Sequence, residues 1–292
     1  MAKEIRAEDL KVKLLGISAS ARHGNTDLAI KKALEAAAAE PFVAETDFIR
    51  LGDLNLVPCK GCMKCWGWRA PAEDEEFECY ESHDDSAMVM KRMKWADGII
   101  IGTPIYHGQK SSLLAILMEK CHCFGFLSYT RNAGKLMHKA LGAIEVGYTD
   151  WGGHATVYTE VLAWGIQMGV WPAYWNGDYY GDTQPHRGGM CATLDAKSEF
   201  DGDAILKESA KYIPPLMGSR NMRGVRNMGR STAIAALHAK AALIQIKREG
   251  VKLPEIRPFK TYNTKPEEGS YLDKLVKEGK LELTADARAP KW

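Results

Sequence analysis

Four cysteines between residues 59 and 79 carry the strongest chemical signal in the sequence. Cys59, Cys62 and Cys65 recur at two-residue spacing, and Cys79 follows after the intervening residues 66–78. Thiolates in a C-x2-C-x2-C pattern are a common set of ligands for an iron–sulfur cluster. Four thiolates also suit a structural zinc ion, and free thiols that only pack against their neighbours are the third alternative. The spacing favours a metal centre in this segment.

A loop rich in hydroxyl groups lies near the start of the chain. Residues 18–26 read SASARHGNT and follow the short apolar run VKLLGI at Val12–Ile17. Backbone N–H groups at a helix N-terminus, together with hydroxyls and an arginine, form a site for a phosphate group. The segment contains neither a G-x-G-x-x-G pattern nor a Walker loop. The alternative is an ordinary helix start in which Asn25 or Thr26 is the N-cap.

Two further polar loops follow expected strands. Residues 103–108 (TPIYHG) come after the apolar run at 98–101, and residues 147–154 (GYTDWGGH) come after the run at 141–146. The first of these loops can present backbone amides and an aromatic side chain to a planar ligand. Each loop by itself is compatible with ordinary turn chemistry. Because all three loops are expected at the same edge of one sheet, the sequence favours a common ligand between them.

Apolar runs that suit buried strands alternate with helical patterns along the chain. Strands are expected at 12–17, 44–51, 98–101, 141–146 and 167–174, and helices at 27–39, 84–94, 111–121 and 154–164. Such alternation is typical of a parallel sheet with helices on both faces. Five units of this kind predict an α/β fold with a doubly wound, five-stranded parallel sheet. Its ligand crevice is expected outside the carboxyl ends of the strands.

Composition limits the class of protein. The chain has 292 residues, of which 46% are hydrophobic and 26% are charged, and this balance suits a soluble globular protein with a sizeable core. We found no run of about eighteen apolar residues and no apolar segment at the start, so we expect neither a membrane span nor secretion. The expected location is the cytoplasm. In that reducing compartment the seven cysteines favour metal or redox roles over disulfides.

Three motifs in combination resemble one known family. They are S-x-S-x-R-x-x-N-T at 18–26, P-C-x-G-C-x-x-C at 58–65 and D-G-I-I-I-G-T-P-I-Y at 97–106. Residues 11–215 thereby resemble the NAD(P)H-dependent FMN reductase superfamily, and particularly its iron–sulfur flavoprotein branch. The resemblance implies a flavodoxin-like fold, FMN as cofactor and a [4Fe–4S] cluster. In that branch the fourth cysteine lies a few residues after the third, whereas here the candidate is the more distant Cys79.

The resemblance also implies roles for individual residues. The implied cluster ligands are Cys59, Cys62, Cys65 and Cys79. The residues implied for the FMN phosphate are Ser18, Ser20, Arg22, Asn25 and Thr26. Those implied for the isoalloxazine ring are Thr103, Pro104, Ile105, Tyr106, His107 and Gly108 in one loop, and Gly147, Gly152 and Gly153 in another. Tyr106 and His107 are the candidate catalytic groups, because they can protonate a reduced substrate beside the ring.

The C-terminal part of the chain exceeds what the resembled family core requires. We therefore expect an FMN-binding domain at 1–215, which includes the cysteine-rich insert at 59–79. A basic helical extension is expected at 216–292. Its interpretation is an arm that contributes to oligomerisation or to the substrate site.

One helix is expected within this extension. It spans 232–248, with Ser231 as its N-cap and Gly250 at its end. Arginines precede the helix, but no nucleic-acid-binding motif accompanies them, so we expect no nucleic-acid partner. A homo-oligomer, either a dimer or a tetramer, is the expected assembly.

The pairing of a flavin with a cluster defines the expected activity. A flavin exchanges two electrons with an organic molecule, whereas a cubane cluster passes single electrons. We therefore expect a flavin-dependent oxidoreductase that couples chemistry on a small-molecule substrate to one-electron transfer, with NAD(P)H or ferredoxin as exchange partners. The alternatives are a non-catalytic electron carrier between ferredoxin and another enzyme, and a cluster-free NAD(P)H-dependent flavin or quinone reductase.

Overall fold

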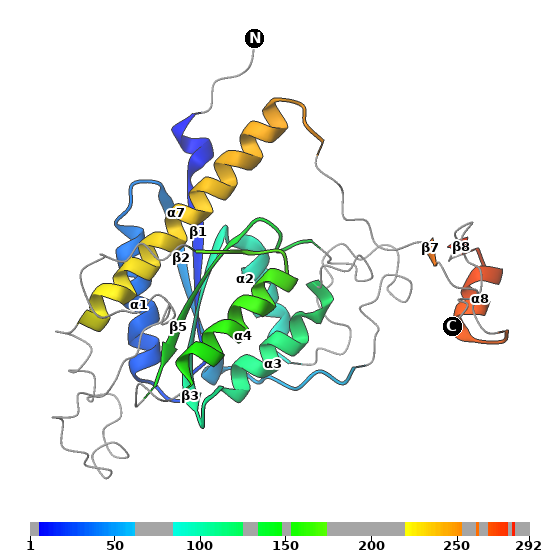
Figure 1. The fold of residues 1–292 in the computed structure, drawn as a ribbon, viewed down its shortest axis with the longest axis horizontal. Helices are drawn as coiled ribbons and strands as arrows, with labels where there is room; N and C mark the ends of the chain where they lie inside the picture. Colours follow the sequence, from blue (N-terminus) through cyan, green and yellow to red (C-terminus); the bar gives the residue numbers. More distant parts are fainter. Residues whose placement is uncertain are drawn as a thin grey trace.

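The structure, a computed structural model, shows a central sheet with helices packed on either side (Figure 1). The residues that it describes are 6–61, 84–124, 134–147, 153–173, 220–252, 261–262, 268–279 and 282–283. The short elements are the 3-10 helices η1 (Ala7–Leu10), η2 (Leu51–Asp53) and η3 (Cys121–Phe124), the strands β7 (Thr261–Tyr262) and β8 (Glu282–Leu283), and the helix α8 (Tyr271–Lys277). The strands β7 and β8 pair with each other and do not join the main sheet.

The main sheet is parallel except for one short strand. Its order is β2 (Val43–Arg50), β1 (Val12–Ser18), β3 (Gly98–Tyr106), β5 (Ala140–Val146) and β6 (Trp171–Pro172). The short strand β4 (Gln109–Lys110) pairs antiparallel with the end of β3. Numbered along the chain, the parallel strands lie in the order 2-1-3-4-5, so the ligand crevice falls between β1 and β3, where the order reverses. The predicted doubly wound α/β fold is confirmed.

Helices cover both faces of the sheet because successive strand residues point to opposite sides and both sides are apolar. On one face lie α1 (Asn25–Ala38) and α7 (Arg220–Arg248), and on the other lie α2 (Ser86–Trp95), α3 (Ser112–Lys120) and α4 (His154–Gln167). The strand β5 shows the alternation. Leu141 and Ala143 belong to the core beneath α2, α3 and α4, whereas Ala140 and Ile144 belong to the core beneath α1 and α7.

The third strand is longer than predicted. The loop expected at 103–108 instead continues β3 as far as Tyr106. The reason is that the backbone stays in register with β5 up to the pair of Pro104 and Val146. Beyond that pair, Ile105 and Tyr106 form a hairpin with β4. The polar segment after β3 is therefore a strand end and a tight turn.

The fifth strand is shorter than predicted. Part of the expected range, 167–174, belongs to the end of α4 and to a turn in which Gly169 has φ +76°. Among the described residues, which end here at Ala173, only the two residues of β6 pair with β5. Tyr174, the last residue of the predicted strand, lies outside the described residues.

Helix α7 begins earlier than predicted and ends where expected. It starts at Arg220, and Ser231 lies buried within it, so the assignment of Ser231 as N-cap is wrong. At the other end Gly250 has φ +70°, and the N–H of Val251 reaches the carbonyl of Ile246 (3.1 Å). This geometry is a Schellman motif, in which glycine takes the left-handed position.

Helix α7 packs on the sheet of its own chain. Val225, Met228 and Ala236 are buried in the core that α1 also covers. Lys240 Nζ donates to Asp97 Oδ2 (3.2 Å), just before β3. The helix completes the cover over β1, β3 and β5. It acts as part of the doubly wound fold.

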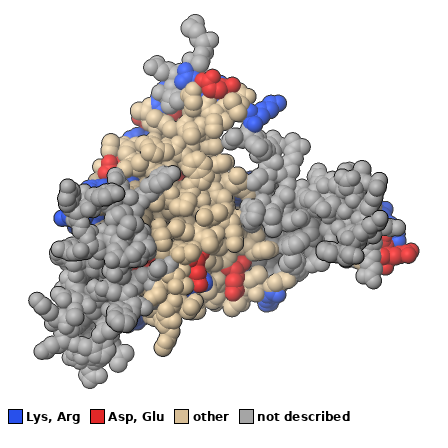
Figure 2. All heavy atoms as spheres, viewed as in Figure 1, with Lys and Arg blue, Asp and Glu red and all other residues tan. Residues whose placement is uncertain are grey.

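Neither the charged side chains on the surface nor the described helices identify a binding partner. Figure 2 shows the described Lys and Arg side chains of one face in scattered groups, without a continuous patch. None of the described helices combines the length and the apolar character needed to cross a bilayer. The cytoplasmic location, the homo-oligomer and the domain division at residue 215 stay predictions.

Gly229 allows α7 to approach α1 closely. A Cβ at this position would lie 1.9 Å from the carbonyl oxygen of Ala33 and 2.6 Å from its carbonyl carbon. Both are backbone atoms of α1, so no side-chain rotation can relieve the clash. The contact between the two helices therefore depends on the absence of a side chain here.

We predict that Gly229→Ala lowers the free energy of unfolding by about 2 kcal/mol, because the two helices must separate. The loss is expected although alanine favours a helix over glycine by about 1 kcal/mol. Urea denaturation measures it. Arg226→Ala, at an exposed position of α7, is the control and should change stability by less than about 0.5 kcal/mol. A Gly229→Ala protein as stable as the wild type would contradict the close contact.

Candidate functional site

The loop between β1 and α1 offers hydrogen-bond donors at the carboxyl edge of the sheet. The first backbone bond of α1 joins Leu28 N to Gly24 O (3.0 Å), so the N–H groups of residues 25–27 precede it. Ser20 closes a turn beside them: its hydroxyl donates to Arg22 O (2.7 Å) and accepts from Arg22 N (3.1 Å). The Arg22 side chain is exposed. A helix N-terminus beside an arginine suits a phosphate group.

The structure also decides how α1 begins. Gly24 occupies the N-cap and makes no side-chain cap, so the alternative that Asn25 or Thr26 caps the helix is wrong. Asn25 is the first helical residue and is partly exposed, whereas Thr26 is buried. Both predicted residues therefore lie in the first turn, where their backbone N–H groups point out of the helix end.

Asp27 organises the floor of this loop and was missed by sequence reasoning. Its Oδ1 accepts from Ser18 Oγ (2.5 Å), and its Oδ2 accepts from Nε of the buried Arg50 (3.0 Å). His23 Nδ1 lies 3.4 Å from the same carboxylate. Ser18 is thus engaged with the protein itself. An acidic residue in a first helical turn is common, so the sequence gave no distinctive signal for this role.

A buried hydroxyl network joins the first loop to β3 and α3. Ser111, the N-cap of α3, accepts from Leu114 N (3.2 Å) and donates to Ala19 O (2.7 Å). Thr103 Oγ1 accepts from Ser111 N (3.1 Å). Thr103 is 1% exposed, so its hydroxyl is committed to this network. The network fixes the crevice between β1 and β3.

The hairpin after β3 meets the start of α4 through two glycines. His107 (φ +48°) and Gly108 (φ +74°) form the two-residue turn between β3 and β4. Two left-handed residues suit a type I′ hairpin turn. A Cβ on Gly153, the N-cap of α4, would lie 2.5 Å from the carbonyl oxygen of Gly108. Tyr106 beside the turn is 43% exposed, so an aromatic ring borders the point where two predicted loops meet.

The structure brings together only part of the predicted site. Pro104 and Ile105 lie in β3, and Gly147 follows β5. Four predicted residues lie outside the described ones: Gly152, Cys62, Cys65 and Cys79. Within the described ranges, no three potential metal-ligating side chains gather around one point. Structural information on a cluster therefore comes from residues 55–57 and 84–85, which flank the cysteine segment and form what we call its base.

The two ends of the cysteine-bearing segment are tied together. Asn55 N donates to Asp85 Oδ2 (2.8 Å), and Asp85 N donates to Asn55 O (2.9 Å). Val57 N donates to Asp84 Oδ2 (2.7 Å). Residues 55–57 and 84–85, which flank the cysteine-bearing segment, are thus hydrogen-bonded to each other.

Cys59 lies exposed beside this base. Its Sγ accepts from Gly61 N (3.4 Å), and its own N–H donates to Glu119 Oε2 (3.4 Å) in the last turn of α3. Gly61 has φ +61°, a conformation that favours glycine. N–H groups directed at a sulfur stabilise its negative charge, as they do at cluster ligands.

A buried ion pair holds the base against the core. Lys120 Nζ lies 3.3 Å from Asp84 Oδ2, and the two side chains are 3% and 0% exposed. The Asp84 carboxylate also accepts from the N–H (3.1 Å) and the hydroxyl (2.5 Å) of Ser86, at the start of α2. A buried charge is stable only when it is paired and hydrogen-bonded. This carboxylate meets both conditions.

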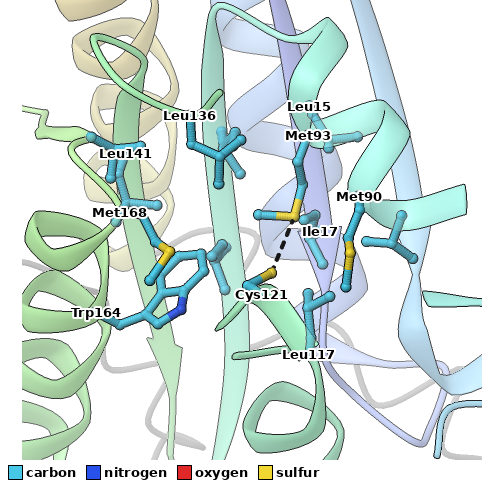
Figure 3. Close-up of a cluster of buried hydrophobic side chains, with 14 of the residues drawn as sticks. Leu15, Ile17, Met90, Met93, Leu117, Cys121, Leu136, Leu141, Trp164 and Met168 are labelled. Atoms are coloured by element: carbon cyan, nitrogen blue, oxygen red, sulfur yellow. Dashed lines mark hydrogen bonds between the residues drawn. The ribbon is translucent and has the colours of Figure 1, made fainter. Parts of the chain in front are cut away.

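Two further cysteines belong to the hydrophobic core. Cys121 and Cys123 are buried, and Cys121 Sγ lies 4.0 Å from the sulfur of Met93. Figure 3 shows Cys121 among apolar side chains, one of which is Leu117 of the preceding helix α3. Burial raises the pKa of the Cys121 thiol. These thiols therefore have a packing role.

Glu145 is a buried carboxyl group near the end of β5. It lies one residue before the end of the strand and is 1% exposed, and neither carboxylate oxygen has a hydrogen-bond partner among the residues that the structure describes. Burial raises the pKa of Glu145 to about 8, against a smaller opposing effect of its own backbone N–H. Burial and the charge of Glu145 also raise the pKa of Tyr158 in α4. A single glutamate in an apolar run does not indicate from the sequence alone that its carboxyl group will be buried.

Comparison with known proteins identifies the family. Residues 12–181 match the family model of the NADPH-dependent FMN reductases. The chain belongs to this family. It is 38% identical over 151 residues to an iron–sulfur flavoprotein of Methanocaldococcus jannaschii, a match that covers 51% of this chain and 69% of that protein. An iron–sulfur flavoprotein of Archaeoglobus fulgidus is 29% identical over 214 residues, which cover 73% of this chain and 100% of that protein.

These relatives place this FMN reductase family member in the iron–sulfur flavoprotein branch, as the three motifs implied. It is a flavin-dependent oxidoreductase. The solved structure of RosB with 8-demethyl-8-formylriboflavin-5′-phosphate has a similar fold, with a TM-score of 0.51 and 17% identity. That match covers 89% of this chain and 98% of RosB, and it concerns the fold alone.

We predict that Asp84→Asn lowers the free energy of unfolding by about 3 kcal/mol, because it leaves the buried charge of Lys120 uncompensated. Urea denaturation measures the loss. Asp85→Asn is the matched control, since its amide oxygen still accepts from Asn55 N, and its cost should stay near 1 kcal/mol or below. Equal costs for the two variants would show that the ion pair does not stabilise the base.

We predict that Glu145→Gln gains stability over the wild type as pH rises. The pKa of Glu145 is about 8 in the folded protein and 4.5 when unperturbed. Below pH 4.5 the carboxyl is protonated in both states. Between these values only the unfolded chain ionises freely, so the wild type loses up to about 1.4 kcal/mol per pH unit. Urea unfolding at several pH values measures the difference, and a difference independent of pH would contradict the buried neutral carboxyl.

Proposed function

We propose that this protein is an oxidoreductase that contains FMN and a [4Fe–4S] cluster, and that couples two-electron chemistry on a small organic molecule to one-electron transfer. The observation that carries the proposal is the closed base of the cysteine segment. It brings the chain before Cys59 next to the chain after Cys79, in a protein whose family binds flavin.

The residues at the carboxyl edge of the sheet fit FMN. The N–H groups that begin α1 and the exposed Arg22 suit its phosphate. The exposed Tyr106 and the turn at His107 and Gly108 suit its ring system. When bound, FMN supplies the exchange of electron pairs with NAD(P)H or with the substrate. We assign to the side chains of Tyr106 and His107 the donation of a proton to a reduced substrate.

The base of the cysteine segment fits a cluster ligand set. Cys79 precedes Asp84 by only a few residues, so the bond from Val57 to Asp84 keeps both ends of the segment together. The entropy of closing a loop grows only slowly with its length, so the long spacing before Cys79 is compatible with a fourth ligand. The N–H of Gly61 donates to Cys59 Sγ (3.4 Å), a contact that suits a thiolate ligand. The cluster supplies one-electron transfer when bound.

Helix α3 supports both proposed centres. Its N-cap, Ser111, is hydrogen-bonded to the first loop, and Glu119 in its last turn contacts Cys59. Its nine residues span about 13 Å. A rigid helix between the centres keeps their separation constant, which suits electron transfer from one to the other.

Metal and flavin contents of anaerobically purified protein test the proposal. We expect about four irons and four sulfides per chain with one FMN. Flavin without iron, even after anaerobic reconstitution, would contradict the cluster and favour a simple flavin reductase. Four thiolates with zinc instead of iron would have the same meaning.

Two variants separate the two centres. Cys62→Ser should lose iron and keep FMN, because the phosphate loop does not depend on the cysteine segment. Arg22→Ala should weaken FMN binding by roughly tenfold or more and keep iron, because it removes a charge-assisted contact. Iron retained in Cys62→Ser would remove this residue from the ligand set, and unchanged FMN affinity in Arg22→Ala would place the phosphate elsewhere.

A further inference from the structure

Glu145 lies just below the edge where the loops of the proposed flavin site meet. One residue separates it from Gly147, so roughly 7 Å of strand joins the two positions. Its neighbour in the adjacent strand is Thr103, from which β3 leads into the turn at His107. The carboxyl is therefore enclosed between the strand ends that carry two of the three predicted loops. The inference that follows rests on the proposed flavin site.

The side chain of Glu145 belongs to the α4 side of the sheet. Leu141 and Ala143, at alternate positions of β5, lie in the core beneath α4, and Glu145 continues this series. Tyr158 of α4 packs against the same core and is partly exposed. Burial raises the pKa of Tyr158, and the charge of Glu145 adds to this effect.

The other described elements around Glu145 do not neutralise it. β3 contributes the uncharged Thr103, and the two residues of β6 are Trp171 and Pro172. Lys110 of β4 is paired with Glu160 of α4 (3.0 Å). Helices α1 and α7 cover the opposite face. Among the described residues, no cation contributes to the pKa of Glu145.

A carboxyl in this position costs stability in its ionised form, and groups with shifted protonation are concentrated at functional sites. We propose that Glu145 is a proton-binding site linked to the oxidation state of the flavin: it takes up a proton when the flavin site gains negative charge. Glu145 acts on the flavin through its charge. It is therefore a positioning residue and not a catalytic residue, since it does not reach the substrate.

The proton balance of this step is simple. A hydride from NAD(P)H adds two electrons and one proton, and hence one negative charge, to the flavin site. Above about pH 8, Glu145 is ionised while the flavin is oxidised. A nearby negative charge disfavours a second one, so on reduction the Glu145 carboxylate binds a proton. One O–H bond forms on Oε1 or Oε2, and the proton comes from the solvent. The added negative charge is then balanced by the proton taken up from the solvent.

Potentiometric titration of the protein with bound FMN tests the linkage. Above pH 8 the wild type should bind one more proton on reduction than Glu145→Gln does. The flavin potential of the wild type should therefore fall with pH more steeply than that of Glu145→Gln. The extra slope is about 30 mV per pH unit for a two-electron couple, which corresponds to a tenfold change in the equilibrium constant. Glu160→Gln, which removes from α4 the carboxylate that pairs with Lys110, is the control and should keep the wild-type slope.

Infrared spectroscopy of the same samples reads the proton directly. The reduced-minus-oxidised difference spectrum above pH 8 should contain the carbonyl stretch of a newly protonated carboxyl group. The band should be present in the wild type and in Glu160→Gln, and absent in Glu145→Gln. Equal potential slopes in the wild type and Glu145→Gln, or an equal band in both, overturn the proposal.

The failure of the proposed function has a different signature. If the wild type holds no FMN, the flavin site is wrong and the linkage is overturned with it. In that case an infrared pH titration of the flavin-free protein still shows whether Glu145 alone keeps its proton up to about pH 8. If FMN binds and the slopes are equal, the flavin site stands and only the linkage is wrong.

Discussion

The hydroxyl of Ser111 is the contact on which the arrangement of the site depends. It begins α3, holds the end of β1 through Ala19 and lies against Thr103 at the end of β3. A crevice at the reversal of strand order needs the ends of β1 and β3 in fixed positions. Ser111 ties both strands to α3, and this helix extends to the base of the cysteine segment at Glu119.

Local signals were enough to predict the sheet, its helices and the loops that follow its strands, because buried strands and helices differ in the spacing of apolar residues. Features that depend on distant partners were missed. β3 continues to Tyr106 because β5 and β4 pair with it, and Ser231 lies inside a helix whose earlier part packs on α1. The pairing of Asp27 with Arg50 and the isolation of Glu145 arise only when elements pack together.

Two buried carboxyl groups, those of Asp84 and Glu145, have opposite environments. Asp84 receives a lysine, a hydroxyl and backbone N–H groups, so its charge is retained and it strengthens the junction between two loops. Among the described residues, no lysine or hydroxyl partners Glu145, and burial raises its pKa to about 8. The first arrangement contributes rigidity, because removing a partner is costly. The second leaves a group whose charge responds to its surroundings, which is what a redox site can use.

The closed base at Asn55 and Asp85 separates the length of the cysteine segment from the geometry of the sheet. The strands and helices that precede the segment, and those that follow it, are held in place by contacts outside the segment. Longer or shorter segments can therefore be grafted at this junction at little cost in closure entropy. The same flavin scaffold can in this way carry inserted segments of different length and composition without a change of fold.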